Sequence, residues 1–179
     1  MVTTSLKQII LFLCIFVYTL SYAQDVDKFL YKKRKKMVQP IDITLSEYAG
    51  PVPPPLVYEI DVHVVMKDKK LCLFHKEKAE KKGAEWGKNI DDCVALSETQ
   101  IKLLAEHLLK ADFPKWQEKR FTEKEHTAVG LSFNHLTIHW GDKKLTFEYF
   151  LKDLDNEAYT KQKDFIAFLK GFYASLKSK

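Results

Sequence analysis

Two cysteines in the body of the chain are the residues most suited to covalent chemistry. They are Cys72 and Cys93, whereas Cys14 lies in an apolar segment near the N-terminus. An even number of cysteines in an exported chain is typical of a disulfide, which restricts the unfolded chain and contributes about 3 kcal/mol. We therefore predict a Cys72–Cys93 disulfide. The alternative is a reactive thiol, for which His75 is the nearest base along the chain.

Six histidines raise the question of a metal site. The alternation of apolar and polar residues predicts His63, His135 and His139 on one face of a sheet, with Glu148 opposite His135. His135 and His139 lie about 13 Å apart along one strand and cannot share an ion. A metal site would have to join His63 to His135 and Glu148. We expect instead a solvated His135–Glu148 pair, with no metal and no other cofactor.

Catalytic signatures are missing from the sequence. It contains no motif typical of serine hydrolases, kinases, zinc metalloproteases or nucleotide-binding loops. The acidic pairs Asp91–Asp92 and Asp153–Asp155 lie in polar surroundings that favour turns and helix caps rather than acid catalysis. We therefore assign no catalytic residue. The sequence favours a non-catalytic protein, with a small secreted metal-dependent enzyme as the alternative.

An apolar segment at the N-terminus has the length of a signal peptide. The run from Ile9 to Leu20 has twelve residues, whereas a membrane span needs about twenty. Ser21 and Ala23 supply the small residues that a signal peptidase requires before Gln24. We predict cleavage after Ala23, a secreted or periplasmic mature protein and no transmembrane span after cleavage. An uncleaved anchor is the rival interpretation.

Net charge resides in a short basic run. Removal of Lys7 with the signal peptide leaves 28 lysines and arginines against 24 acidic residues, and five of the 28 form the run Lys32–Lys36. Without that run the balance is 23 to 24, so the folded body is nearly neutral and nucleic acid is not expected as a partner. The run is either a solvated tail, which we favour, or an adhesive for anionic phospholipid or polysaccharide.

The mature chain divides into a lead-in and a body. Residues 24–55 are basic and then rich in proline, ending in the stiff segment Gly50–Pro55. Within this lead-in, Ile41–Leu45 alternates apolar and polar residues and predicts a short strand added to a sheet edge. Residues 56–179 are predicted to form a single domain.

Two β-hairpins are predicted in the body. Asp68–Lys69 suits a two-residue turn, and Gly141–Asp142 suits a type II′ turn in which the glycine takes positive φ. The registers that follow keep one apolar face continuous. The predicted pairs are Met66 with Leu71, Val64 with Leu73, Ile138 with Leu145 and Leu136 with Phe147.

Each hairpin is followed by a predicted helix. Ser97 and Gln100 form a capping box, and the apolar stripe behind them ends before Pro114. A second stripe predicts a final helix that begins near Asp155 or Asn156. The expected fold is α+β in the order ββαββα, with an antiparallel sheet from two hairpins and two helices on one face.

With the signal segment, the Gly50–Pro55 lead-in and the second hairpin Leu136–Phe147, the chain resembles small uncharacterised secreted bacterial domains of ββαββα order. That resemblance implies an exported domain and carries no activity with it. A looser likeness is to secreted inhibitor folds of cystatin or β-lactamase-inhibitor type, but the Gln-x-Val-x-Gly loop typical of cystatins is absent from the sequence.

The helix-free face of the predicted sheet carries more apolar residues than solvent favours. They are Val65, Phe74, Phe133 and Phe150, with Phe133 opposite Phe150. Either a partner or the tethered segment Ile41–Leu45 could cover them, and tethering favours the segment. Trp86 and Trp116, in polar loops, are further candidate contact residues, although each could fold back as a loop anchor.

These observations together predict an exported, non-catalytic binding or accessory module. Its partner would be a protein or an anionic envelope polymer, recognised through the helix-free face and the two tryptophans. A structural envelope protein held by its basic tail is a further alternative.

Overall fold

The computed structural model describes residues 10–11, 25–31, 39–48, 58–79, 90–126, 132–172 and 176. The chain divides into two compact units, Met1–Gln39 and Pro40–Lys179. In the first unit, residues 25–30 are helical, and the backbone amide of Gln39 donates to the carbonyl of Leu30. None of the helices described is long and apolar enough to cross a membrane.

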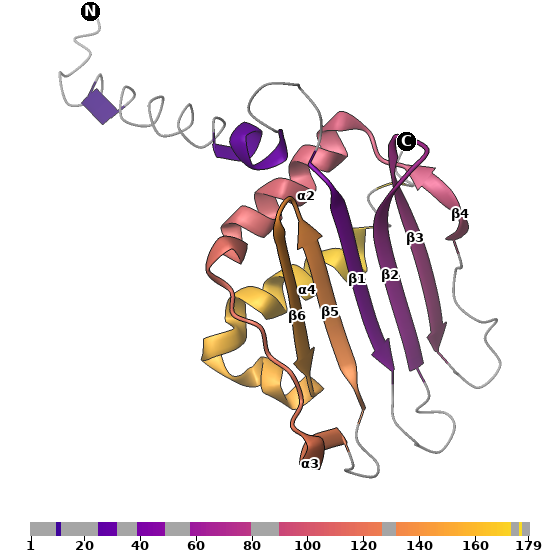
Figure 1. Cartoon of the computed structure of the whole chain (residues 1–179), viewed down its shortest axis with the longest axis vertical. Coiled ribbons are helices and arrows are strands. Elements are labelled where there is room, and N and C mark those ends of the chain that lie inside the picture. The colour runs from indigo at the N-terminus through magenta and orange to yellow at the C-terminus, as the bar shows by residue number, and fades with distance from the viewer. Residues whose placement is uncertain are drawn as a thin grey trace, which may run out of the picture. The chain divides into compact units, whose positions relative to one another are not determined.

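A six-stranded antiparallel sheet forms the second unit (Figure 1). The strands are β1 (Ile41–Tyr48), β2 (Tyr58–Lys67), β3 (Lys70–Ala79), β4 (Ile90–Ala95), β5 (Asn134–Trp140) and β6 (Lys143–Tyr149). Their order across the sheet is β4-β3-β2-β1-β5-β6. The strand that sequence analysis assigned to the lead-in therefore belongs to the same compact unit as the body.

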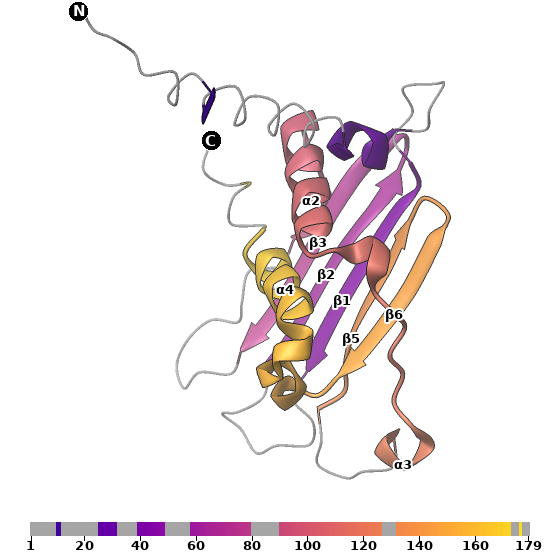
Figure 2. The ribbon, with the colours of Figure 1, turned by 90° about the vertical axis from the view of Figure 1, so that its left-hand side faces the viewer.

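Helices cover one face of this sheet (Figure 2). The α-helices of this unit are α2 (Glu98–Lys110), α3 (Glu123–His126) and α4 (Thr160–Phe172). The described part of the chain also contains the short 3-10 helices η1 (Phe113–Lys115), after α2, and η2 (Leu151–Asp155) and η3 (Glu157–Tyr159), between β6 and α4. Of these elements, α2 and α4 pack on the sheet, so the α+β class is confirmed.

The position of β1 corrects the predicted two-hairpin layout. Both hairpins form with the predicted registers. However, β1 lies between them and pairs with β2 on one side and β5 on the other. Its residues Ile41, Ile43 and Leu45 are buried on the helix-covered face. A central position satisfies the backbone of β1 on both sides, whereas an edge position would leave half of its polar groups unpaired.

Helix boundaries follow their capping residues. Both hydrogen bonds of the predicted Ser97–Gln100 capping box are present at the start of α2. The final helix begins at Thr160, later than predicted. The side chain of Asn156 accepts a hydrogen bond from the amide of Ala158 and so caps the 3-10 turn η3 instead of the α-helix itself.

Candidate functional site

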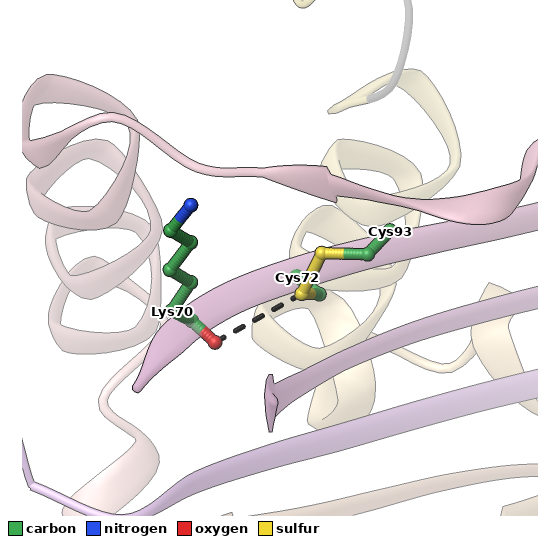
Figure 3. The surroundings of a disulfide bond; sticks show 3 residues. All are labelled: Lys70, Cys72 and Cys93. Carbon is green, nitrogen blue, oxygen red and sulfur yellow. Dashed lines mark hydrogen bonds between the residues drawn. A yellow bond between two sulfur atoms is a disulfide. The ribbon is translucent and has the colours of Figure 1, made fainter. Parts of the chain in front are cut away.

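A disulfide joins the edge strand β4 to β3 (Figure 3). Cys72 and Cys93 are bonded, with their Cα atoms 5.1 Å apart, so the predicted cysteine pair is present. The register of this pair shifts, because Leu73 pairs with Val94 but His75 pairs with Ile90. Three residues of β4 therefore lie opposite a single residue of β3, Phe74. This bulge re-aims Cys93 toward Cys72. A thiolate nucleophile at Cys72 would require the disulfide to be reduced first.

An apolar patch surrounds this disulfide on the helix-free face. It consists of Val65 and Phe74, which are half-buried, and of Cys93 and Ala95, which are exposed. The registers make these residues neighbours, because Cys72 stands between Val65 and Ala95. We call these four residues the apolar patch. Figure 1 shows no helix over this face among the described residues, and the patch keeps part of its surface in contact with solvent through Cys93 and Ala95.

Two charged or titratable side chains border Phe74. The His63 ring lies 6.1 Å from the Phe74 ring, and the Lys67 ammonium lies 5.9 Å from its centroid. His63 Nε2 is also 3.0 Å from a carboxylate oxygen of Asp42, one strand away. The border of the patch therefore offers both a cation and an imidazole–carboxylate pair to a ligand.

The metal alternative fails on geometry. Because β1 separates β2 from β5, His63 lies two strands, or about 10 Å, from the column that holds His135. The predicted His135↔Glu148 register is present, but Glu148 also accepts a 2.5 Å hydrogen bond from the amide of Phe121. Within the described residues, no three His, Cys, Asp or Glu side chains lie close enough together to hold a metal ion.

Phe133 and Phe150 lie against each other as predicted, but their cover was not foreseen. Phe121 stacks on Phe150 at 4.5 Å between centroids and meets Phe133 edge-on at 5.6 Å. Phe150 is only 7% exposed. The expectation that Ile41–Leu45 covers this pair is therefore wrong, because Phe121 packs on Phe150 and Phe133, and Phe133 itself stays half-buried.

That connection, residues 117–121, is held along the free side of β6, and we call it the edge strap. Lys119 donates its amide to Thr146 O at 3.0 Å, and its carbonyl accepts the amide of Glu148 at 2.8 Å. The Lys119 ammonium donates to Asp153 at 2.7 Å and lies 5.7 Å from the Phe121 ring centroid. The strap thereby satisfies backbone groups that an edge strand would otherwise expose.

The tryptophan predictions have different outcomes. Trp116 is 7% exposed, and its indole N–H donates to the carbonyl of Ala111 at 2.7 Å. Its ring meets Phe113 and Phe165 edge-on. Trp116 is thus a loop anchor rather than a contact residue, which corrects the prediction. Trp86 lies outside the described residues.

A buried polar cluster under the sheet was missed by sequence analysis. The carboxylate of Glu47 is 1% exposed, accepts the Tyr149 hydroxyl at 2.5 Å and pairs with the Lys170 ammonium. The hydroxyl of Tyr58 is also buried, and burial together with the Glu47 charge raises the pKa of Tyr58. The signal was available in principle, because Glu47 continues the buried alternation of Ile41–Leu45.

This cluster, which we call the Glu47 clamp, is suited to holding α4 on the sheet. Burial first, and then the Glu47 carboxylate, raise the pKa of Tyr149, which therefore stays a hydrogen-bond donor at neutral pH. Both carboxylate oxygens of Glu47 are engaged, one by Tyr149 and one by Lys170. Such an arrangement joins β1 to both β6 and α4 through one buried carboxylate.

Comparison with known proteins adds no further constraint. No family model matches the chain, and no curated protein or solved structure shows significant similarity to it. The candidate site therefore rests on its own geometry, and the exposed apolar patch of the helix-free face is the strongest feature.

Proposed function

We propose that this protein is an exported, non-catalytic binding module whose recognition surface is the apolar patch. The observation that carries the proposal is a partly exposed Phe74, next to Val65 and the Cys72–Cys93 disulfide, on a sheet face without helices. A face of this kind is expected to be polar unless a partner covers it. The patch replaces Trp116 and Phe150 as the contact surface, since both of those are buried.

The chemistry of the patch supports recognition. A disulfide and a β-bulge make the surface stiff, so little conformational entropy is lost when a partner orders it. Phe74 offers an aromatic anchor, and Lys67 beside it offers a cation to an acidic group. The partner that fits best is a protein, or a surface polymer, with an apolar group next to an anionic one.

Export is part of the proposal. A twelve-residue apolar run followed by Ser21 and Ala23 supports cleavage before Gln24, and an oxidising compartment suits the disulfide. The intact mass of the protein recovered from producing cells measures this directly. A mass that retains residues 1–23 would show an anchored protein instead.

The recognition surface is tested by substitution of Phe74. Phe74→Thr removes the anchor while keeping a residue that strands accept, so the fold is expected to survive. His139→Thr on β5 is the matched control, because it changes the same sheet face on the far side of β1 from the patch. The chain serves as bait against its native envelope, and captured species are identified by mass spectrometry. Capture lost with Phe74→Thr and retained with His139→Thr supports the patch, whereas equal capture by both refutes it.

A further inference from the structure

Both hairpin turns of the sheet lie at the same end. Asp42 pairs with Val65 and Ile41 pairs with Trp140, so β1 begins where β2 and β5 end. The turns Asp68–Lys69 and Gly141–Asp142 therefore lie at the same end of the sheet, on either side of β1 and opposite to α3 (Figure 1). We call this end, with residues 66–70 and 141–144, the turn end.

Positive charge gathers at the turn end of an otherwise neutral unit. Pro40–Lys179 contains 22 lysines and arginines and 22 acidic residues. The turn end has four exposed lysines against two exposed aspartates. They are Lys67, Lys69, Lys70 and Lys144, against Asp68 and Asp142. This asymmetry directs the unit toward anionic surfaces even though its net charge is zero.

Lys143 is set apart from this group by its contacts. Its ammonium donates to the carbonyls of Phe113, Pro114 and Trp116 at 2.8 to 3.0 Å. It therefore holds η1 against β6 and is not counted with the exposed lysines.

Two further features distinguish the β2–β3 turn from an ordinary polar loop. Met66 is 37% exposed, which makes it one of the few large apolar side chains in the described residues that reach solvent to this extent. Asp68 and Lys69 have φ values of 49° and 64°, a conformation for which Asn-Gly is usual. A lysine at such a position costs about 1 kcal/mol. The backbone conformation that exposes Lys69 therefore lowers the stability of the fold, and backbone strain of this kind is common at functional sites.

We propose that the turn end docks on a bilayer surface that contains anionic phospholipid. The ammonium groups of Lys67, Lys69 and Lys70 would lie at the level of the phosphates, where each lysine strengthens binding about fivefold. Met66 would enter the boundary between headgroups and acyl chains. An exposed apolar side chain at the same end of the sheet as these lysines favours a bilayer over a purely anionic polymer, which offers nothing apolar to bury.

The turn end adjoins the recognition surface proposed above and shares Lys67 with its border, whereas Val65 and Phe74 of the apolar patch lie outside the turn end. The apolar patch lies on the sheet face, and the turn end lies at its margin. The basic run Lys32–Lys36 precedes β1 by only four residues in the sequence and would add to the same attraction. Variants must therefore separate the two basic segments.

Vesicle co-sedimentation tests the docking. The chain from Gln24 to Lys179 is used, because it keeps the whole compact unit Pro40–Lys179 and lacks the apolar segment that would itself insert. Lys67, Lys69 and Lys70 are changed together to glutamine. The matched control changes Lys124, Lys152 and Lys163, which are exposed residues of α3, η2 and α4, to glutamine with the same loss of charge. The vesicles are phosphatidylglycerol mixed with phosphatidylcholine, or phosphatidylcholine alone.

The expected result is binding to the mixed vesicles alone, about a hundredfold weaker in the turn-end variant and nearly unchanged in the control. Met66→Ser should weaken binding about tenfold. Phe74→Thr should leave vesicle binding intact, which separates this proposal from the recognition surface.

Four outcomes would overturn the proposal. The first is that the parent chain does not bind the mixed vesicles. The second is that both lysine variants lose vesicle affinity equally, which would show that binding depends on net charge alone. Deletion of Lys32–Lys36 could abolish binding while the turn-end variant retains it, which would assign the contact to the tail. Turn-end-dependent binding to an acidic polysaccharide, with Met66→Ser without effect, would identify a polymer instead of a bilayer.

Discussion

Lys170 of α4 forms an ion pair with the carboxylate of Glu47 in β1. The contact joins the last turn of the final helix to the strand that unites the two hairpins. It is also the only anchor of this kind in the described part of the chain that combines a carboxylate as buried as Glu47 with a partly exposed cation. Its energetic role follows from that asymmetry.

Removal of the cation should cost more than removal of the carboxylate. Lys170→Met leaves the buried Glu47 charge without its partner and is expected to lower the free energy of unfolding by about 3 kcal/mol. Glu47→Gln frees a lysine that reaches water and should cost about half as much. Lys163→Met, on the exposed side of the same helix, is the control and should stay within about 0.5 kcal/mol. Urea unfolding measures all three, and equal small effects would show that the clamp does not hold α4.

Alkaline pH should unfold the protein through its buried tyrosines. Burial raises the pKa of both Tyr58 and Tyr149, so the folded state keeps protons that the unfolded chain releases above about pH 10. These two tyrosines make their full contribution to the free energy of unfolding below that pH, and the contribution is lost as the pH rises above it. The absorbance of tyrosinate, followed beside circular dichroism, should show two tyrosines that ionise only as the fold is lost. Ionisation of Tyr58 and Tyr149 while the fold is intact would contradict this.

Mild acid should weaken the contact between α2 and α4. The His107 ring stacks on Phe168 at 3.7 Å, and burial is the main cause that lowers the pKa of His107. The folded state then binds a proton less readily than the unfolded chain, so stability falls as pH drops below about 6.5. His107→Phe keeps a ring in place without the titration. Its melting temperature should vary less between about pH 7 and about pH 5 than that of the parent chain, and identical pH profiles would argue against this role for His107.

Relief of the strained turn should stabilise the fold. Lys69→Gly removes the cost of positive φ at this position and is expected to raise the free energy of unfolding by about 1 kcal/mol. Lys69→Ala loses the same charge but keeps the strain, so it should leave stability almost unchanged. Thermal melting compares the two variants. A gain shared equally by both would point to charge repulsion among the lysines as the cause.

Local features were predictable because their determinants lie close together in the sequence. The turn pairs Asp68–Lys69 and Gly141–Asp142 set both hairpin registers, and Ser97 with Gln100 set the start of α2. The Cys72–Cys93 pair followed from a count of cysteines and a signal-like N-terminus. In the two turns and the helix cap, a few neighbouring residues suffice to favour one backbone geometry over its alternatives.

Long-range placements depended on the tertiary structure. The alternation of Ile41, Ile43 and Leu45 is the same for an edge strand, a central strand or a cover over the sheet, because a period of two reports only which side chains share a face. Pairing on both sides made β1 central, and that choice separated His63 from His135 and placed Glu47 beside Tyr149 and Lys170. Phe121 likewise covers Phe150 only because the edge strap pairs with β6. Composition and spacing determined the apolar faces, the hairpin turns, the helix cap and the cysteine pair. Which of these side chains contact each other was decided by the pairing of the strands, because each strand must find hydrogen-bond partners for its backbone.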